Sequence, residues 1–478
     1  MADFVFLCNL KQSITAMLQN DLNHFGEILQ KILEQGVAFL QTIDQRPTSA
    51  PHTVKLVTDL EENGKGTAAV LAEFKQRFDP LIVASSGPRS WGFVTGGATP
   101  AAVAGDWLAG VYDQNPQAIQ GQGDLSALIE VETIQLLLSL FDLPDTFTGG
   151  FVTGATMSNF TALAVGRQWA GKQQGRDIAK EGVGKGVKVL SATPHSSAVK
   201  SLSMLGLGSQ NFIKINTLLG NREAIDVADL EAKIQVLSGE PFILISSGGT
   251  VNTVDFDDLE AIARLKEKYN FWWHIDAAFG GFAACSPKYK HLLKGWEGAD
   301  SITVDCHKWL NVPYESAFFL VKKEHSILQV ETFQNSNAPY LGNPLENFSF
   351  LNFLPENSRR LRALPAWFTL KAYGKKGYQE IVENSIQMAQ LLDDFIQQSS
   401  DFELLAPTRL NNVCFTLKGE ENQDKVHSFL TQLNQRGKVF MTPTVYNGKK
   451  GIRAAFVNWR TLEKDVEIAI AEMKAVLA

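Results

Sequence analysis

The chain has 478 residues, of which 45% are hydrophobic and 20% charged, and its formal net charge is −7. This length predicts a large domain with one or two smaller ones, and the apolar fraction excludes a wholly disordered chain. The mild acidity excludes the basic surface that a nucleic acid or an anionic membrane would require. No apolar stretch approaches the roughly 20 residues that span a bilayer, so we expect no membrane partner.

The N-terminal residues lack the basic leader of a secretory signal, and their apolar run is short. The four cysteines are scattered and lack the paired spacing of a disulfide framework or a zinc site. The composition therefore predicts a cytoplasmic enzyme without a bound metal.

The first predicted element is a long amphipathic helical stretch over residues 10–45, with apolar side chains at helical spacing. Its apolar face must cover a surface, either on the same chain or on a second subunit. An irregular segment over residues 85–100 follows and contains Trp91 and Phe93.

Helical and strand patterns alternate after this segment. A helical run over residues 124–143 precedes five short apolar strands, each followed by a helical segment, at 150–153, 187–192, 242–246, 271–276 and 302–305. This alternation predicts an α/β domain with a mostly parallel sheet that helices cover on both faces.

The pattern changes after about residue 365 to a smaller α+β arrangement. We expect helices at 375–399, 423–436 and 461–477 and strands at 412–417, 439–442 and 452–457. The chain thus divides into an N-terminal helical segment (1–97), a large domain (98–365) and a small C-terminal α+β domain (366–478).

Chemically active residues follow the predicted strands. Ala155 and Thr156 open a helix after the first strand, where free N–H groups and the helix dipole suit an anion. His195, Asp276 and Lys308 follow later strands, and ligands of α/β sheets bind beyond these strand ends. Each residue alone has an ordinary structural explanation. Together they match pyridoxal 5′-phosphate (PLP), which needs a lysine, a carboxylate for its ring nitrogen and a phosphate cradle.

Two motifs carry a family resemblance. Residues 273–281 (WHIDAAFGG) are followed, 32 residues after Asp276, by Lys308 in the sequence DCHKWLNVP. These motifs resemble the group II PLP-dependent decarboxylases, which include aromatic L-amino acid, glutamate and diaminobutyrate decarboxylases. The resemblance extends from about Pro88 to Arg453. It implies an aspartate aminotransferase-like (fold type I) large domain, a dimer-wrapping N-terminal segment, and a homodimer with active sites at the subunit interface.

The resemblance also implies a role for individual residues. Lys308 would hold PLP as a Schiff base, Asp276 would pair with the pyridinium nitrogen, and His195 would stack on the ring and move protons near the substrate carboxylate. The remaining matches are Ala155, Thr156 and His307 at the phosphate, Thr250 and Ala278 beside the ring, and Asn159 behind the first layer of contacts.

Trp91 and Phe93 fall in the segment that lines the substrate pocket from the neighbouring subunit in this family. The alternative is that both are ordinary core aromatics. If they line the pocket, an aromatic or apolar substrate is favoured over a dicarboxylic one, although Arg89 is near enough to remain a candidate carboxylate clamp.

Several positions depart from the family pattern. Met157, Val251, Glu315 and Ala317 replace residues that are common there, and we expect these changes to retune the site. Family decarboxylases also carry a tyrosine on a mobile loop that protonates the substrate carbon in the partner's site. Alignment from residues 358–360 puts Phe350 there, in a substrate-pocket position, while the nearest tyrosine is Tyr340.

The prediction is a PLP-dependent carboxy-lyase that converts an L-amino acid, with an aromatic one favoured, to the amine and CO2. Loss of the loop phenol would instead favour decarboxylation with oxidative deamination to an aldehyde. Glutamate, aspartate or diaminobutyrate remain alternative substrates. An aminotransferase and a cofactor-binding protein with little catalysis are the competing classes.

Overall fold

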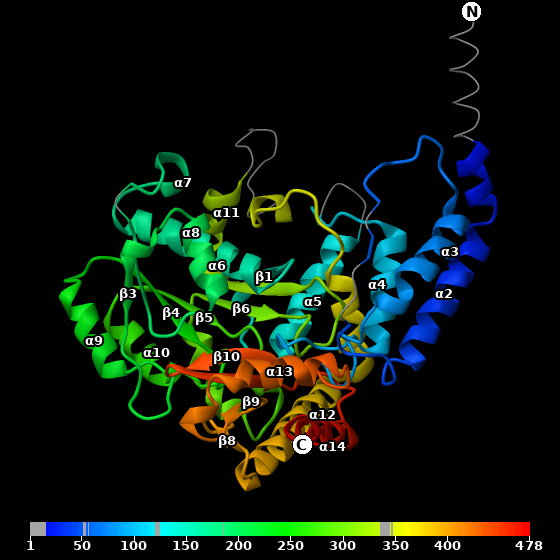
Figure 1. Ribbon diagram of the computed structural model, residues 1–478. Helices are drawn as coiled ribbons and strands as arrows, with labels where there is room; N and C mark the ends of the chain where they lie inside the picture. The colour runs from blue at the N-terminus through cyan, green and yellow to red at the C-terminus, as the bar shows by residue number, and fades with distance from the viewer. Residues whose placement is uncertain are drawn as a thin grey trace, which may run out of the picture.

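The computed structural model describes residues 16–50, 54–55, 57–119, 125–184, 186–334, 345 and 348–478. A large domain surrounds one sheet, a small domain surrounds a second sheet, and two N-terminal helices, α2 (Phe25–Gln41) and α3 (Thr67–Arg77), extend from one side (Figure 1). Among these described residues, no helix combines the length and the apolar character needed to cross a bilayer.

The large domain is built on a seven-stranded sheet in the order β1-β7-β6-β5-β4-β2-β3. Its strands are β1 (Phe147–Val152), β2 (Lys188–Ser191), β3 (Phe212–Lys214), β4 (Phe242–Ser247), β5 (Trp272–Asp276), β6 (Ser301–Asp305) and β7 (Ala317–Lys322). Strand β7 runs antiparallel to β1 and β6, and the other pairs are parallel. The predicted mostly parallel sheet is therefore confirmed, with β3 and β7 added to the five expected strands.

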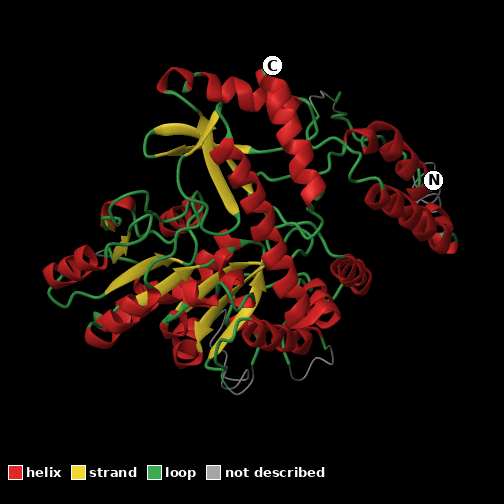
Figure 2. Cartoon of the chain, turned by 90° about the horizontal axis from the view of Figure 1, so that it is seen from below, coloured by secondary structure: helices red, strands yellow, loops and turns green. Residues whose placement is uncertain are grey.

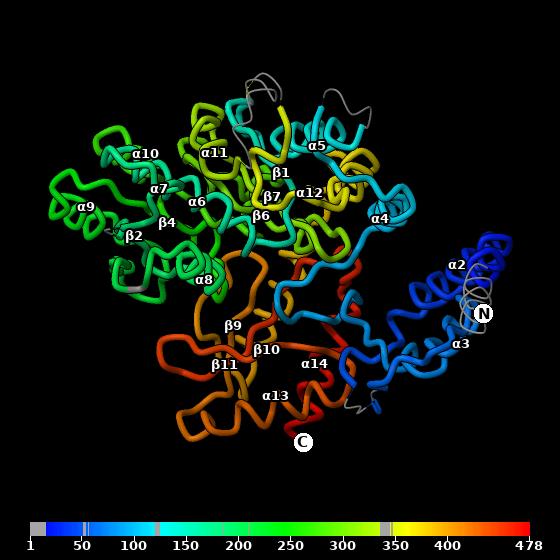
Figure 3. The backbone as a smooth tube through the Cα atoms, turned by 90° about the horizontal axis from the view of Figure 1, so that it is seen from above, coloured from blue at the N-terminus to red at the C-terminus, as the bar shows by residue number. Residues whose placement is uncertain are grey.

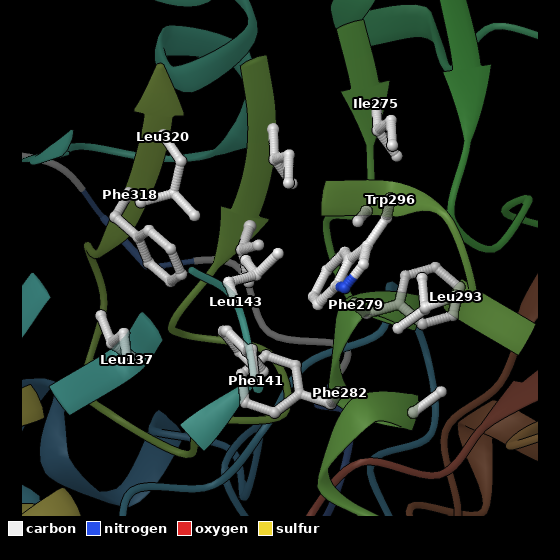
Figure 4. Close-up of a cluster of buried hydrophobic side chains, with 14 of the residues drawn as sticks. Leu137, Phe141, Leu143, Ile275, Phe279, Phe282, Leu293, Trp296, Phe318 and Leu320 are labelled. Carbon is white, nitrogen blue, oxygen red and sulfur yellow. The ribbon is translucent and has the colours of Figure 1, made fainter. Parts of the chain in front are cut away.

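Side chains of the strands alternate between two buried clusters, one on each face of the sheet. In β4, Ile243 and Ile245 join one cluster and Leu244 joins the other. The first face is covered by α6 (Ala155–Gln173), α8 (Ser196–Met204) and α11 (Ser326–Phe333). The second face is covered by α5 (Ser126–Leu140), α9 (Val227–Val236), α10 (Leu259–Lys268) and the first part of α12 (Ala363–Gln398). Figure 4 shows part of this second cluster, in which Phe141, Phe282 and Phe318 lie together.

The small domain contains a four-stranded antiparallel sheet in the order β10-β11-β9-β8. Its strands are β8 (Phe402–Leu404), β9 (Asn412–Leu417), β10 (Thr442–Tyr446) and β11 (Lys449–Ala455), and its helices are α13 (Lys425–Gln435) and α14 (Glu463–Leu477). The strand expected at 439–442 begins only at Thr442, because Phe440 forms a bridge with Ser90 of the segment before α4 (Pro100–Tyr112).

Helix α12 joins the two domains (Figure 2). It crosses the expected boundary at residue 365, bends at Gly374, where φ is +60°, and continues into the small domain. The remaining short helix, α7 (Ile178–Glu181), lies at the surface beyond α6. The helix expected over 124–143 is observed as α5, and residue 124 itself lies outside the described residues.

Candidate active site

A cavity of about 290 Å3 lies at the carboxyl ends of the parallel strands, beside the small domain. It is lined by Phe93, Val94, Thr193, His195, Ser247, Gly249, Thr250, Val251, Asp276, Ala278, Phe279, Lys308 and Arg453. Six of the residues predicted from the sequence are among them: Phe93, His195, Thr250, Asp276, Ala278 and Lys308. Residues after four strands (β2, β4, β5 and β6) and Arg453 of the small domain together line this one cavity.

Lys308 lies in the turn after β6, with its ammonium group inside the cavity. Its Nζ is 2.9 Å from Oδ2 of Asp305, the last residue of β6, and 5.8 Å from the ring centroid of Phe279. A lysine that is shielded from water beside an aromatic wall is well placed to become a nucleophile toward an aldehyde.

Asp276 ends β5 and is held by donors on both carboxylate oxygens. Oδ1 accepts a hydrogen bond from the amide of Ala278 (3.2 Å), and Oδ2 accepts one from Nδ2 of Asn159 (3.0 Å). These donors fix the orientation of the carboxylate, which can thus face a protonated ring nitrogen.

A relay of hydrogen bonds lies behind Asp276 and was not predicted from the sequence. Oδ1 of Asn159 accepts from Nε2 of His274 (2.8 Å), whose Nδ1 is 2.9 Å from Oγ of Ser301. Burial lowers the pKa of His274 to about 4, so the ring is neutral and carries its proton on Nε2. A polar His274 in an otherwise apolar strand, two residues before Asp276, is the sequence signal that could have revealed the relay.

His195 is fixed by the same relay. Asn159 donates to Oγ of Ser197 (3.1 Å), and this hydroxyl lies 2.7 Å from Nδ1 of His195, which also accepts from the Ser197 amide (3.2 Å). Burial lowers the pKa of His195 below its ordinary value, although the charge of Asp276 opposes this effect. The neutral ring therefore carries its proton on Nε2.

The predicted phosphate residues gather at the N-terminus of α6. The amide of Ala155 is the first of the helix, with Thr156 next to it, and Nε2 of His307 lies 3.4 Å from Oδ1 of Asp305, the same oxygen that the Ala155 amide contacts. Nδ1 of His307 accepts from the Ser316 amide, and burial lowers the pKa of this histidine, so Nε2 carries the proton.

The residues that line the cavity, together with the donors at the N-terminus of α6 next to Lys308, fit PLP. A Cβ at Gly154 would lie 3.5 Å from Cε1 of His307, so glycine keeps open the space in front of the helix terminus. A helix N-terminus with a histidine N–H suits a phosphate, while Lys308 and Asp276 suit the aldehyde and the ring nitrogen.

Trp91 does not line the cavity, which corrects the expectation for this residue. It is 0% exposed, its ring centroid is 4.4 Å from that of Phe456, and its Nε1 donates to the Pro88 carbonyl in the small-domain core. A side chain buried within its own chain cannot reach a partner's pocket. Phe93, in contrast, is 68% exposed and lies in the cavity wall.

Phe350 is also misplaced by the sequence analysis. It is 1% exposed, begins the short 3-10 helix Phe350–Asn352, and lies 4.5 Å beneath the guanidinium of Arg359, which forms a buried ion pair with Glu130. It is a core residue and not a substrate-pocket residue, because alignment by residue counting takes no account of loop length. Tyr340 lies outside the described residues.

Arg89 is engaged elsewhere, and a different arginine lines the cavity. Arg89 is buried and pairs with Asp465 at 2.7 Å, so it is not a carboxylate clamp. Arg453 of β11 enters the cavity wall, where its Nη1 donates to the Val251 carbonyl (3.1 Å) and its Nε has no hydrogen-bond partner among the described residues. Arg453 was not predicted from the sequence, although a lone arginine within the apolar run GIRAAF was a visible signal.

Comparison with known proteins agrees with this geometry. The family model described as the pyridoxal-dependent decarboxylase conserved domain matches residues 51–418. An aromatic-L-amino-acid decarboxylase of Bacillus atrophaeus is 28% identical over 88% of each chain, and a 3,4-dihydroxyphenylacetaldehyde synthase of Aedes aegypti is 26% identical over 96% of this chain and 90% of its own. The fold matches Oryza sativa TDC, solved with PLP and tryptamine, with a TM-score of 0.86 and 22% identity over 95% of this chain and 97% of that one. The chain therefore belongs to the group II pyridoxal-phosphate-dependent decarboxylases, a family of amino acid carboxy-lyases.

Proposed function

We propose that the protein decarboxylates an L-amino acid, with an aromatic side chain favoured, to the amine and CO2. The observation that carries this proposal is one cavity that unites Lys308, Asp276 and His195 with the aromatic wall of Phe93 and Phe279. The relatedness to aromatic-L-amino-acid decarboxylases supports the same substrate class.

Bound PLP supplies an electron-accepting ring that stabilises the electrons left on the substrate carbon when CO2 departs. Lys308 would hold the aldehyde carbon, and Asp276 would keep the ring nitrogen protonated. His195 would cover the ring face and hold a proton on Nε2 near the substrate carboxylate. The amides of Ala155 and Thr156 and the Nε2–H of His307 would bind the phosphate, while Thr250 and Ala278 would flank the ring.

The cationic residues that line the cavity favour an aromatic substrate over a dicarboxylic one. Besides Lys308, the arginine among the lining residues is Arg453, which would face the single carboxylate of an aromatic amino acid. A glutamate or aspartate substrate needs a second cation, and Arg89 is committed to Asp465. Phe93 and Phe279 would pack against the substrate ring.

Aldehyde formation is the second candidate. Phe350 no longer supports it, because this residue is buried away from the cavity. The support is that the relatives include a 3,4-dihydroxyphenylacetaldehyde synthase and a phenylacetaldehyde synthase at identities similar to that of the amine-forming relative.

Product analysis separates these candidates. The purified protein, supplied with PLP, is incubated in air with a panel of L-amino acids, and amines, aldehydes and peroxide are measured. We expect amine from an aromatic amino acid, no product from Lys308→Ala, and normal product from Lys180→Ala at an exposed position. Aldehyde with peroxide would establish the second candidate, amine only from glutamate or aspartate would overturn the aromatic preference, and no product from any amino acid would contradict both.

We further propose that the protein is a homodimer. Helix α2 stands apart from the body and exposes Phe25, Leu29 and Leu33, an apolar stripe that an isolated subunit leaves in water (Figure 3). A second copy of the chain is the partner that would cover it.

A further inference from the structure

Asp305 lies between the N-terminus of α6 and Lys308. It ends β6 and is 3% exposed. Its Oδ1 accepts a hydrogen bond from the Ala155 amide at 3.0 Å and faces Nε2 of His307 at 3.4 Å, while its Oδ2 is 2.9 Å from Nζ of Lys308.

All three contacts are with groups that the proposed function assigns to PLP. The Ala155 amide and the His307 Nε2–H would bind the phosphate, and Lys308 would hold the aldehyde carbon. A buried carboxylate therefore engages the donors of the anion site and neutralises the lysine at the same time. One N–H cannot donate a full hydrogen bond to a carboxylate and to a phosphate oxygen at once. A carboxylate and a phosphate that share the same donors also repel each other.

We propose that Asp305 is a positioning residue that competes with the cofactor's phosphate for the cradle at the N-terminus of α6. In the chain without cofactor, it pairs with Lys308 and with the donors of the cradle. With cofactor bound, the charge of Asp305 would lie beside the phosphate and weaken phosphate binding. The site therefore holds PLP less tightly through its phosphate than the same cradle would with a neutral residue at 305. This inference rests on PLP as the cofactor, which family membership establishes, and it holds for any amino acid substrate.

The test compares two ligands that differ only in the phosphate. Cofactor-free protein is titrated with PLP and with pyridoxal, and the ratio of the two dissociation constants measures what the phosphate contributes. Asp305→Asn removes the charge and keeps the shape, so we expect its preference for PLP over pyridoxal to rise by about tenfold or more. Any change in Lys308 reactivity affects both ligands and cancels in the ratio.

Asp276→Asn is the matched control. It removes the buried carboxylate at the end of β5, which would face the ring nitrogen that both ligands share. Both dissociation constants should rise while their ratio stays constant. A ratio unchanged or reduced in Asp305→Asn would overturn the proposal. Failure of the unmodified protein to bind PLP would contradict the cofactor itself, which is a distinct outcome.

Two further measurements keep the proposal testable if Asp305→Asn does not fold. Asp305→Ser is the second variant, since its hydroxyl is uncharged and can still accept from the Ala155 amide. In the Asp305→Ser variant, millimolar inorganic phosphate should strengthen pyridoxal binding more than it does in the unmodified protein, because Asp305 opposes an anion in the cradle. Equal strengthening in the two proteins would overturn the proposal.

Discussion

Asn159 lies behind the reacting groups, and its one amide connects three neighbouring side chains. It donates to Asp276 and to Ser197, which positions His195, and it accepts from His274. An amide suits this place because it offers two donors and an acceptor without a charge. The carboxylate and the imidazole of the cavity are therefore oriented by a single buried side chain.

Replacement of Asn159 should impair catalysis without unfolding the protein. Asn159→Ala leaves the Nε2–H of His274 and one oxygen of Asp276 without their partner, so we expect kcat to fall by about ten- to hundredfold. Asn159→Asp should be worse, because it places a second negative charge beside Asp276. Steady-state kinetics and the circular dichroism of the bound cofactor measure the effect, and an unchanged kcat in both variants would contradict the assigned role.

His274 should make stability depend on pH. Its pKa is about 4 in the folded chain and 6.5 in the unfolded chain, so between these values only the unfolded chain binds the proton. The free energy of unfolding is thus lost as pH falls from 6.5 toward 4, by about 1.4 kcal/mol per pH unit from this residue. His274→Gln keeps a donor for Asn159 and does not titrate, so its Tm should fall less than that of the unmodified protein when pH drops from about 7 to about 5. Parallel decreases in Tm would show that His274 is not protonated on unfolding.

At the scale of elements, the irregular segment before α4 holds the turn that carries Lys308 in place through hydrogen bonds from its backbone amides. The Gly96 amide donates to the His307 carbonyl at 3.2 Å, the Gly97 amide to Oδ1 of Asn311 at 3.2 Å, and the Thr99 amide to the Asn311 carbonyl at 2.9 Å. The same segment bridges to the small domain through Ser90 and Phe440. Its backbone therefore connects the turn that carries Lys308 to the domain that carries Arg453.

A methyl group at Gly96 should break this connection. A Cβ there would lie 1.9 Å from the Lys308 carbonyl oxygen, which is backbone and cannot swing away. Gly96→Ala should therefore destabilise the protein by about 1–3 kcal/mol and lower the amount of bound cofactor.

Gly26→Ala is the control for Gly96→Ala, because a Cβ at Gly26 meets nothing within 4 Å and alanine favours its helix. Denaturant unfolding and the cofactor content of the purified variants provide the comparison. Equal stability of the two variants would mean that the segment before α4 can shift without a loss in the free energy of unfolding.

At the scale of the whole molecule, the two domains bury their apolar surfaces, whereas the N-terminal helices leave much of theirs exposed. Both faces of the large sheet are covered, and the small domain has its own core. Helix α2 contacts the body near its C-terminal end, where Gly36 lies beside Trp107 of α4, and its Ile28 is buried, but Phe25, Leu29 and Leu33 face water. This imbalance is the basis for the proposed homodimer.

Charges on the exposed stripe of α2 should dissociate the dimer. Leu29 and Leu33 are 40% and 41% exposed, and replacing both with Asp should shift the mass toward the monomer. Leu60→Asp is the control, since this leucine is 100% exposed and lies outside the helices. Light scattering after size-exclusion chromatography measures the mass, and a monomeric unmodified protein would refute the proposed assembly.

The α/β class, the mostly parallel sheet and the position of the chemical groups were predictable from the sequence, because strand and helix patterns are local. Lys308, Asp276 and His195 each follow a strand, and parallel strands bring their ends to one edge. Strand β3 has only three residues, too few to show a pattern. Strand β7 is a continuous apolar run, AFFLVK, which periodicity alone does not separate from a buried helix.

The tertiary structure alone decided which side chains meet across distant segments. Trp91 and Phe350 lie in irregular stretches with no period to indicate their exposed face, and long-range packing buries both. Arg453 reaches the cavity because the small domain folds back over the strand ends, and Asp305 meets the α6 amide across 150 residues of chain. Sequence patterns determine local structure and thereby the strand ends, whereas burial and charge contacts depend on packing between segments that are far apart in the chain.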